Sequence, residues 1–409
     1  MCAALEKEPN RMTTFSELPL SAALQQKLAA AQFTILTPIQ QQAIPLALAG
    51  RDVIGTAQTG TGKTLAFLLP LIEMLRREPS RHASALILLP TRELAMQVHQ
   101  QYERLRQTGV DRAALVIGGV SEQSQIHSLR SKCRLVIATP GRLQDFLDRK
   151  LVDLQAIKML VLDEADRMLD MGFLPAIRRI VALLPQSRQT LCFSATIDDS
   201  VAMLMRDYTR NPARVTVDPR LKPAASVQLA AYEVRPTEKM DTLEQLLSAE
   251  SGQSLVFART KRGADRIGKS LVRSGFSAAV IHGDRSQSQR NKALNGFQEG
   301  RYQVLVATDI AARGLHVDDV AHVINYDVPK MAEDFVHRVG RTGRAGSCGQ
   351  ASTLVAGAEL IELRDIERAL KLRIERRRVN TIPADSPRQP IQNTLITRTL
   401  VALPGEVFA

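Results

Sequence analysis

The sequence has no tryptophan, and aromatic residues make up only 4% of its 409 residues. Proteins that hold nucleic acid mainly by base stacking need several aromatic side chains, so this composition argues against such a binding mode. Four cysteines, at positions 2, 133, 192 and 348, are far apart and form no C-x-x-C pair. Because no histidine stands at zinc-ligand spacing either, the sequence predicts neither a disulfide framework nor a metal framework built on cysteine.

Long apolar segments are absent as well. The best candidate, residues 65–75, is interrupted by Pro70 and Glu73 and is shorter than the roughly 18 residues that cross a bilayer. The first residues, MCAALEKEPNR, mix both charges and lack the apolar core of a secretory signal. We therefore predict a cytoplasmic protein without a membrane partner.

The remaining composition is that of a folded chain. Hydrophobic residues make up 44% and charged residues 23%, which is ordinary for a soluble domain. At roughly 150 residues per domain, the length allows two or three domains. Lysine and arginine (54) exceed aspartate and glutamate (42), giving a net charge of +12. This surplus favours a polyanionic partner.

From Val53 onward, short β-branched runs such as DVIGTA, ALILLP and MLVLDEAD alternate with longer segments of helical periodicity. This alternation predicts an α/β fold with buried parallel strands. Three prolines interrupt residues 211–226, which indicates a linker. We predict a disordered extension over 1–12, a first domain over 13–212, a linker over 213–226, a second domain over 227–375 and a tail over 376–409. An amphipathic helix is expected to carry the arginines at 376–378.

The segment AQTGTGKT follows a strand and precedes an apolar helix, which is the context of the phosphate loop G-x-x-x-x-G-K-[ST]. Ala57 replaces the first glycine of the motif. Backbone N–H groups around Gly60 and Gly62 would surround the phosphates, Lys63 would reach the β- and γ-phosphates, and Thr64 would bind Mg²⁺. The residues expected to contact nucleotide here are Ala57, Gln58, Thr59, Gly60, Thr61, Gly62, Lys63 and Thr64.

Two adjacent acids, Asp163 and Glu164, follow the apolar run MLVL. At the end of a strand beside the phosphate loop, Asp163 can meet the Mg²⁺ that Thr64 binds. Glu164 can then accept a proton from the attacking water.

These motifs together resemble those of the DEAD-box RNA helicases, because residues 163–166 spell DEAD and the other signatures follow in that family's order from Phe15 to about Gly349. The resemblance implies two tandem RecA-like domains, each a mostly parallel sheet with helices on both faces. It also implies an ATP-dependent RNA helicase that uses ATP and Mg²⁺. The short ending loosely resembles minimal bacterial members of the RhlE type.

The resemblance assigns roles to further residues. Phe15, Phe33 and Gln40 would hold the adenine, although Gln32 and Leu36 stand where the family usually has glycine and proline. His316 replaces an aspartate that contacts ribose, which predicts weaker ribose contact. RNA would be bound by Pro90, Arg92, Gly118, Gly119, Thr139, Arg142, Arg259, Thr260, Gln287, Arg290, Thr308 and Arg313. Coupling would involve Asp166, Ser194, Ala195 and Thr196, and the catalytic residues would be Lys63, Asp163, Glu164, His337, Arg341 and Arg344, the last two as arginine fingers.

Because the phosphate loop and the arginine fingers lie in different domains, domain closure must assemble the site. We expect RNA-stimulated ATP hydrolysis coupled to local, non-processive unwinding or to remodelling of ribonucleoprotein, by a monomer that contacts the RNA backbone largely independently of sequence. Two alternatives stay open: a double-stranded-DNA translocase of the same architecture, and a nucleotide-gated RNA clamp without strong unwinding. Ribosomal and mRNA-turnover assemblies both remain open as settings.

Overall fold

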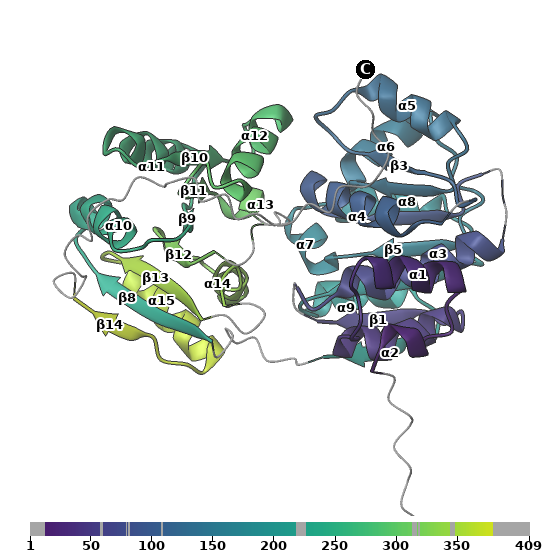
Figure 1. The fold of residues 1–409 in the computed structure, drawn as a ribbon, viewed down its shortest axis with the longest axis horizontal. Helices are drawn as coiled ribbons and strands as arrows, with labels where there is room; N and C mark the ends of the chain where they lie inside the picture. Colours follow the sequence, from purple (N-terminus) through teal and green to yellow (C-terminus); the bar gives the residue numbers. More distant parts are fainter. Residues whose placement is uncertain are drawn as a thin grey trace, which may run out of the picture.

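The computed structural model describes residues 13–57, 60–78, 80, 82–107, 109–217, 226–312, 317, 320–343 and 348–378. The predicted N-terminal extension, part of the predicted linker and most of the predicted tail lie outside these residues. The described chain forms two parallel seven-stranded sheets, each with its own helices (Figure 1).

The first sheet has the strand order β3-β4-β2-β5-β6-β1-β7. Its strands are β1 (Val53–Thr56), β2 (Ala85–Leu88), β3 (Ala113–Val116), β4 (Leu135–Ala138), β5 (Met159–Leu162), β6 (Gln189–Ser194) and β7 (Ala213–Thr216). Every residue of the inner strands β2, β4 and β5 is buried, as the continuous aliphatic runs predict for strands covered on both faces.

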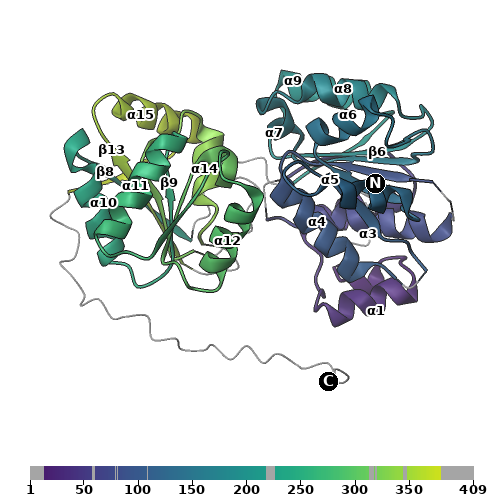
Figure 2. The same cartoon turned by 90° about the horizontal axis from the view of Figure 1, so that it is seen from above.

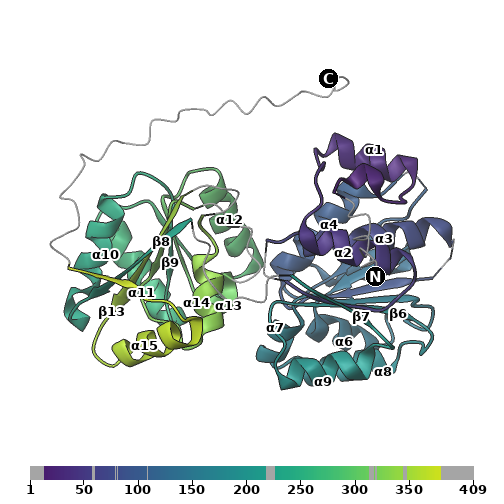
Figure 3. The same ribbon diagram turned by 90° about the horizontal axis from the view of Figure 1, so that it is seen from below.

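Helices cover both faces of the first sheet (Figures 2 and 3). They are η1 (Phe15–Glu17), α1 (Ala22–Ala30), α2 (Pro38–Leu48), α3 (Lys63–Arg77), α4 (Arg92–Leu105), α5 (Glu122–Arg130), α6 (Pro140–Asp148), α7 (Ala165–Asp170), α8 (Leu174–Ala182) and α9 (Asp199–Tyr208). One apolar core joins α1 to α4 with one face of the sheet, and a second core joins α6 to α9 with the other.

The second sheet has the order β10-β11-β9-β12-β13-β8-β14, which repeats the first order with every strand number raised by seven. Its strands are β8 (Val227–Glu233), β9 (Ser254–Phe257), β10 (Ala278–Ile281), β11 (Val304–Ala307), β12 (His322–Asn325), β13 (Gly349–Val355) and β14 (Glu375–Arg377). Its helices are η2 (Pro236–Glu238), α10 (Lys239–Ser248), α11 (Lys261–Arg273), α12 (Gln287–Gln298), α13 (Asp309–Ala312), α14 (Ala332–Val339) and α15 (Glu359–Leu370). Helices α10 and α11 cover one face, and α12 to α15 cover the other.

The structure contradicts two sequence-based expectations: the start of the linker and the helix through residues 376–378. Residues 213–216, which were assigned to the linker, form β7 and pair in parallel with β1. Val215 is buried there, and this burial stabilises the short edge strand. The predicted helix through 376–378 is also wrong. Helix α15 ends before Lys371, which has a left-handed φ of 49°, and Arg376 and Arg377 lie in β14 beside β8. Within the described part of the chain, no helix has both the length and the apolar character needed to span a membrane.

Candidate active site

The phosphate loop joins β1 to α3 and places Lys63 at the first position of that helix. Gly60 and Gly62 have φ angles of 84° and 90°, a left-handed conformation that glycine adopts without steric cost. The buried Lys63 donates a hydrogen bond from Nζ to the Ala57 carbonyl at 2.8 Å. The loop is thereby held at the N-terminus of α3, where backbone N–H groups favour an anion.

The acidic pair follows β5, which is separated from β1 only by β6. Burial raises the pKa of Asp163 to about 7, although the Lys63 ammonium opposes the rise. Burial acts in the same direction on Glu164, but Arg167, Lys63 and His337 outweigh it and hold the pKa of Glu164 below its usual range. The Arg167 guanidinium lies 2.6 Å from the Glu164 carboxylate. The two neighbouring acids therefore differ: only Glu164 is held firmly in the charged form.

Asp166 connects the acidic segment to the SAT segment at the end of β6. Its Oδ2 accepts hydrogen bonds from the backbone N–H groups of Ala195 and Thr196 at 3.0 and 2.9 Å, and from the Thr196 hydroxyl at 3.0 Å. Its own N–H donates to Ser194 Oγ at 3.2 Å. The Ala57 N–H donates to the Ser194 carbonyl at 3.0 Å. One hydrogen-bonded chain thus runs from the DEAD segment through the SAT segment to the phosphate loop.

A cavity of about 530 Å³ opens beside the phosphate loop and extends from Phe15 and Phe33 to Thr64. The two phenylalanine rings have centroids 6.1 Å apart, and the Arg104 guanidinium lies 5.9 Å from the centre of the Phe33 ring. Arg104 was not among the predicted site residues, because it lies on α4 outside any recognisable motif. An aromatic wall that continues into a phosphate loop fits a nucleotide base joined to its phosphates.

The Gln40 amide lines this cavity and is already hydrogen bonded. Its Oε1 accepts from the Thr37 N–H at 2.9 Å, and its Nε2 donates to the Gly62 carbonyl at 2.9 Å. The same amide therefore caps α2 and contacts the phosphate loop. Of the two positions that depart from the family pattern, Gln32 has a left-handed φ of 60°, and Leu36 is buried.

The second domain contributes His337, on α14, to the surroundings of Glu164. His337 lies close enough to Glu164 to lower its pKa, and Arg341 is buried just after the helix. Between them, Arg338 binds Asp309 through two bonds, Nε to Oδ1 at 2.6 Å and Nη2 to Oδ2 at 2.7 Å. This bidentate ion pair fixes the orientation of α14. The sequence did not indicate the pair, because Asp309 lies in another helix, α13.

Glu93, at the start of α4, makes a direct contact between the first domain and helix α12 of the second domain. Its Oε1 accepts from Gln287 Nε2 at 3.1 Å and lies 2.9 Å from Arg290 Nη2, both on α12. Figure 1 shows α12 and α13 on the side of the second sheet that faces α4 and α7. Gln287 and Arg290 were predicted as RNA contacts, and the structure also places them against the first domain.

Other predicted RNA contacts in the first domain lie at the ends of strands. The Arg92 guanidinium packs on Gly118 and Gly119 so closely that a Cβ atom at Gly119 would lie 2.2 Å from Arg92 Nη1. Pro90 is buried just before α4. The two glycines are therefore needed for Arg92 to cross this surface.

Thr139 and Arg142 lie at the start of α6. Thr139 is buried, whereas Arg142 Nη1 donates to Glu122 at 3.2 Å and to Asp145 at 3.3 Å. The Arg142 guanidinium also lies 5.4 Å from the centre of the Phe146 ring. In this structure Arg142 joins α5 to α6.

In the second domain, Arg259 Nη2 donates to the Val328 carbonyl at 2.9 Å and to Glu362 at 2.5 Å. Thr260 caps α11, and Thr308 is buried at the end of β11. Five predicted positions lie outside the described residues; they are Gln58, Thr59, Arg313, His316 and Arg344.

Two family models match this chain: "DEAD/DEAH box helicase" over residues 37–204 and "Helicase conserved C-terminal domain" over residues 238–346. A DEAD-box ATP-dependent RNA helicase CshA from Bacillus licheniformis is 42% identical over 370 residues, which are 90% of this chain and 76% of that protein. This chain belongs to the DEAD-box ATP-dependent RNA helicases. The family predicted from the motifs and the predicted enzyme class, an ATP-dependent RNA helicase, are thereby confirmed.

Solved structures of DEAD-box proteins also match this helicase over most of its length. Saccharomyces cerevisiae Dbp5 bound to RNA and ADP BeF3 has a TM-score of 0.80 at 30% identity, covering 90% of this chain and 96% of that one. A DEAD box protein from Methanococcus jannaschii has a TM-score of 0.52 at 36% identity, covering 90% and 99%. The predicted pair of RecA-like domains is confirmed.

Proposed function

We propose that this helicase hydrolyses ATP between its two domains and uses domain closure on RNA to open short duplexes locally. The observation that carries the proposal is the environment of Glu164, which combines Lys63 and Arg167 of the first domain with His337 of the second. A general base must be charged to accept a proton from water, and these three groups favour its charged form.

The nucleotide fits the cavity beside the phosphate loop. Its base would lie against Phe33, with Arg104 near the ring, and its phosphates would meet the N–H groups around Gly62. Mg²⁺ would be held by Thr64 and Asp163, where it would neutralise charge on the phosphates. The raised pKa of Asp163 fits this assignment, because a buried carboxylate that lacks a sufficient positive partner is where a cation stabilises the charged form.

The contact of Glu93 with Gln287 and Arg290 supports ligand-dependent closure. Gln287 Oε1 and Arg290 Nε are buried without a hydrogen-bond partner among the described residues. Each such atom costs roughly 1–3 kcal/mol, so the closed contact is not strongly favoured by itself. RNA that binds both domains would supply the missing stabilisation, and RNA and ATP would then promote each other's binding.

The likeness to Dbp5 supports the same interpretation. The Methanococcus jannaschii protein is more similar in sequence, 36% against 30%, yet has the lower TM-score, 0.52 against 0.80. Two RecA-like domains that are individually alike lose TM-score when their mutual orientation differs. The arrangement of the domains here therefore resembles that of Dbp5 bound to RNA and ADP BeF3.

Local unwinding would follow from closure. The predicted RNA contacts are arginines, threonines and glycines at strand ends, which suit backbone phosphates and 2′-hydroxyls better than bases. One closure for each ATP bound would open a duplex locally, without continuous translocation.

The test combines RNA-stimulated ATPase with unwinding of a short RNA duplex. Glu164→Gln should retain ATP and RNA binding but lose at least about 100-fold in turnover, because it removes the proton acceptor. Glu103→Gln, which changes a partly buried glutamate that pairs with Arg106 on the same helix, serves as the matched control and should behave as wild type. Full-rate ATPase without RNA, or equal stimulation by duplex DNA, would contradict the proposal. RNA-stimulated ATPase without duplex opening would favour the RNA clamp.

A further inference from the structure

A groove on the second domain lies far along the sheet from the nucleotide cavity, at the edge strand β10. It encloses about 530 Å³ between α11, β10 and α12. Among the described residues β10 pairs only with β11, so its other edge carries no strand. Figure 1 shows this edge at the top of the second domain, with α11 and α12 on its two sides.

On the side away from β11, the backbone of β10 pairs with no other strand in the described part of the chain. The Ser277 carbonyl accepts from the Val304 N–H at 3.0 Å, and the Ile281 carbonyl accepts from the Thr308 N–H at 3.4 Å, so these residues face β11. Backbone groups alternate in direction along a strand. The N–H and C=O groups of Ala278 and Val280 therefore point away from β11 and toward the groove.

The walls of the groove combine apolar surface with positive charge. Val272 is 57% exposed on α11, and the partly buried Tyr302 lines the other wall. Helix α11 approaches β10 closely only because residue 268 is glycine; a Cβ there would lie 2.2 Å from Val280 Cγ2. The strand edge thus lies at the floor of a shallow groove between α11 and α12.

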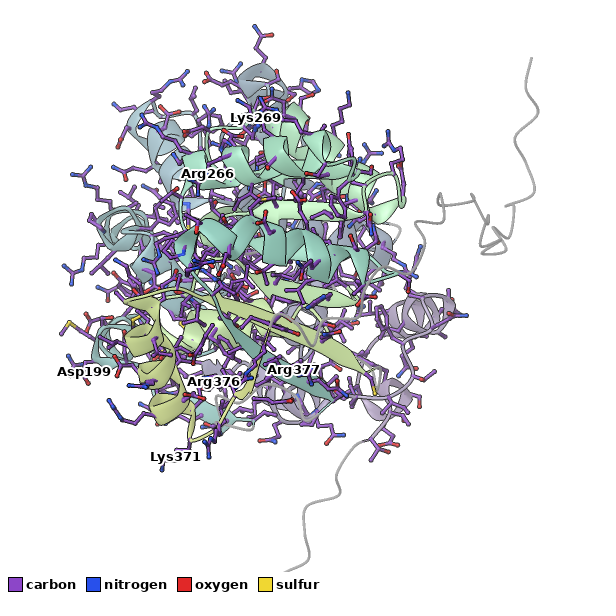
Figure 4. All side chains as sticks on the ribbon, turned by 90° about the vertical axis from the view of Figure 1, so that its left-hand side faces the viewer. Asp199, Arg266, Lys269, Lys371, Arg376 and Arg377 are labelled. Carbon is purple, nitrogen blue, oxygen red and sulfur yellow. The ribbon has the colours of Figure 1, made fainter. Side chains whose placement is uncertain are left out.

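The charges in the groove are unbalanced. Lys269, Arg273 and Lys292 line it without an ion-pair partner in the described part of the chain. The one acid, Asp265, already lies 2.5 Å from Arg285. Figure 4 shows Lys269 on the outer surface of the second domain. The groove therefore carries three uncompensated positive charges.

We propose that this groove binds an extended acidic segment of a partner protein, which adds as a strand to the free edge of β10. A strand in this position would satisfy the outward backbone groups of Ala278 and Val280, and its side chains would point alternately toward α11 and α12. Acidic side chains would pair with the uncompensated lysines and arginine, and aliphatic ones would cover Val272. RNA could pair with the positive charges, but it would not contact the strand edge or the apolar walls. An acidic peptide strand would contact all three, so the groove matches a peptide better than RNA.

The probe is a fluorescein-labelled peptide of alternating glutamate and valine, titrated with the full-length protein by fluorescence anisotropy. Saturable binding is expected. Reversing two charges with Lys269→Glu and Lys292→Glu should weaken it about tenfold or more. Lys330→Glu with Lys371→Glu changes the net charge equally outside the groove and should leave binding unchanged. RNA-stimulated ATPase should be the same in all of these proteins.

Strand addition has its own variant. Ala278→Pro removes an outward N–H while leaving the bonds to β11 intact, which an edge strand tolerates, and it should also weaken peptide binding about tenfold. Thermal unfolding of each variant checks that the second domain is folded. No saturable binding, or equal binding by the groove and control variants, would overturn the proposal. The proposal would also be overturned if Ala278→Pro left peptide binding unchanged. It would be overturned as well if Lys269→Glu with Lys292→Glu lowered the affinity for an RNA oligonucleotide tenfold.

Discussion

Replacing Glu93 by glutamine tests whether the contact between the domains limits closure. Only 4% of the Glu93 side chain and 10% of the Arg290 side chain are exposed, and their charged atoms are 2.9 Å apart. Glutamine keeps the shape and one acceptor for Gln287 but removes the charge that faces Arg290. The perturbation is therefore almost purely electrostatic.

The magnitude follows from the burial of Arg290. Burial lowers the pKa of Arg290 even though Glu93 opposes the shift, so desolvation of this guanidinium is only partly offset. Removing one partner of a buried pair costs roughly 2–5 kcal/mol. Because glutamine retains a hydrogen-bond acceptor, we expect about 2 kcal/mol, the low end of that range. This corresponds to a roughly 30-fold shift from the closed to the open arrangement.

The assay is RNA-stimulated ATPase at saturating ATP. In Glu93→Gln the RNA concentration for half-maximal stimulation should rise roughly 30-fold, because only the closed form binds RNA with both domains. Affinity for ATP measured without RNA should stay unchanged. Arg290→Gln should raise it at least as much, because Arg290 is also a predicted RNA contact. The double variant should match Arg290→Gln alone, since Glu93 then has no charged partner left to lose.

The control is Glu103→Gln on the same helix, where the glutamate pairs with Arg106 at 2.7 Å within the first domain. This change should leave the RNA requirement within twofold of wild type, because the pair lies within the first domain and makes no contact with α12. If Glu93→Gln and Glu103→Gln behaved alike, the contact would not govern closure and the reasoning would be refuted.

Three further predictions concern stability. His322 is buried and its pKa is lowered to about 4, so the unfolded chain binds a proton below pH 6.5 that the folded chain does not. Stability of the second domain should be full above about pH 6.5 and about 2 kcal/mol lower at pH 5, and His322→Gln should remove that part of the pH dependence in denaturant unfolding. Gln32→Gly should stabilise the first domain by up to about 1 kcal/mol, because a left-handed residue other than glycine is strained; an unchanged midpoint would show that no strain is present. Gly55→Ala should destabilise it by about 1–3 kcal/mol. The new Cβ would lie 2.5 Å from the Phe193 ring, whereas Gly141→Ala, with nothing within 4 Å, should be tolerated.

The sequence predicted the parts of the site that local chemistry defines. The phosphate loop needs glycines at left-handed positions, a lysine and a hydroxyl in one short segment, and the structure places Gly60, Gly62 and Lys63 there. The alternation of buried strands and helices likewise indicated two parallel sheets. It did not indicate β7, because a four-residue edge strand after a proline has no periodicity to detect.

Contacts between distant segments escaped sequence reasoning. Nothing near Arg338 in the sequence identifies Asp309 as its partner, and nothing near Glu93 points to residues almost 200 positions later. Arg104 reaches the cavity beside the phosphate loop only because α4 packs beside the loop that carries Phe33. Each of these contacts depends on where whole helices pack.

By itself, then, the sequence determined the family, the paired parallel sheets and the short motifs, since each of these is encoded within a few neighbouring residues. Only the tertiary structure decided which charges meet: Glu164 lies beside His337, Glu93 lies beside Arg290, and three groove cations have no ion-pair partner among the described residues. The physical reason is that electrostatic interactions and burial depend on distance in space. Packing of the two domains sets those distances, and the order of residues along the chain does not.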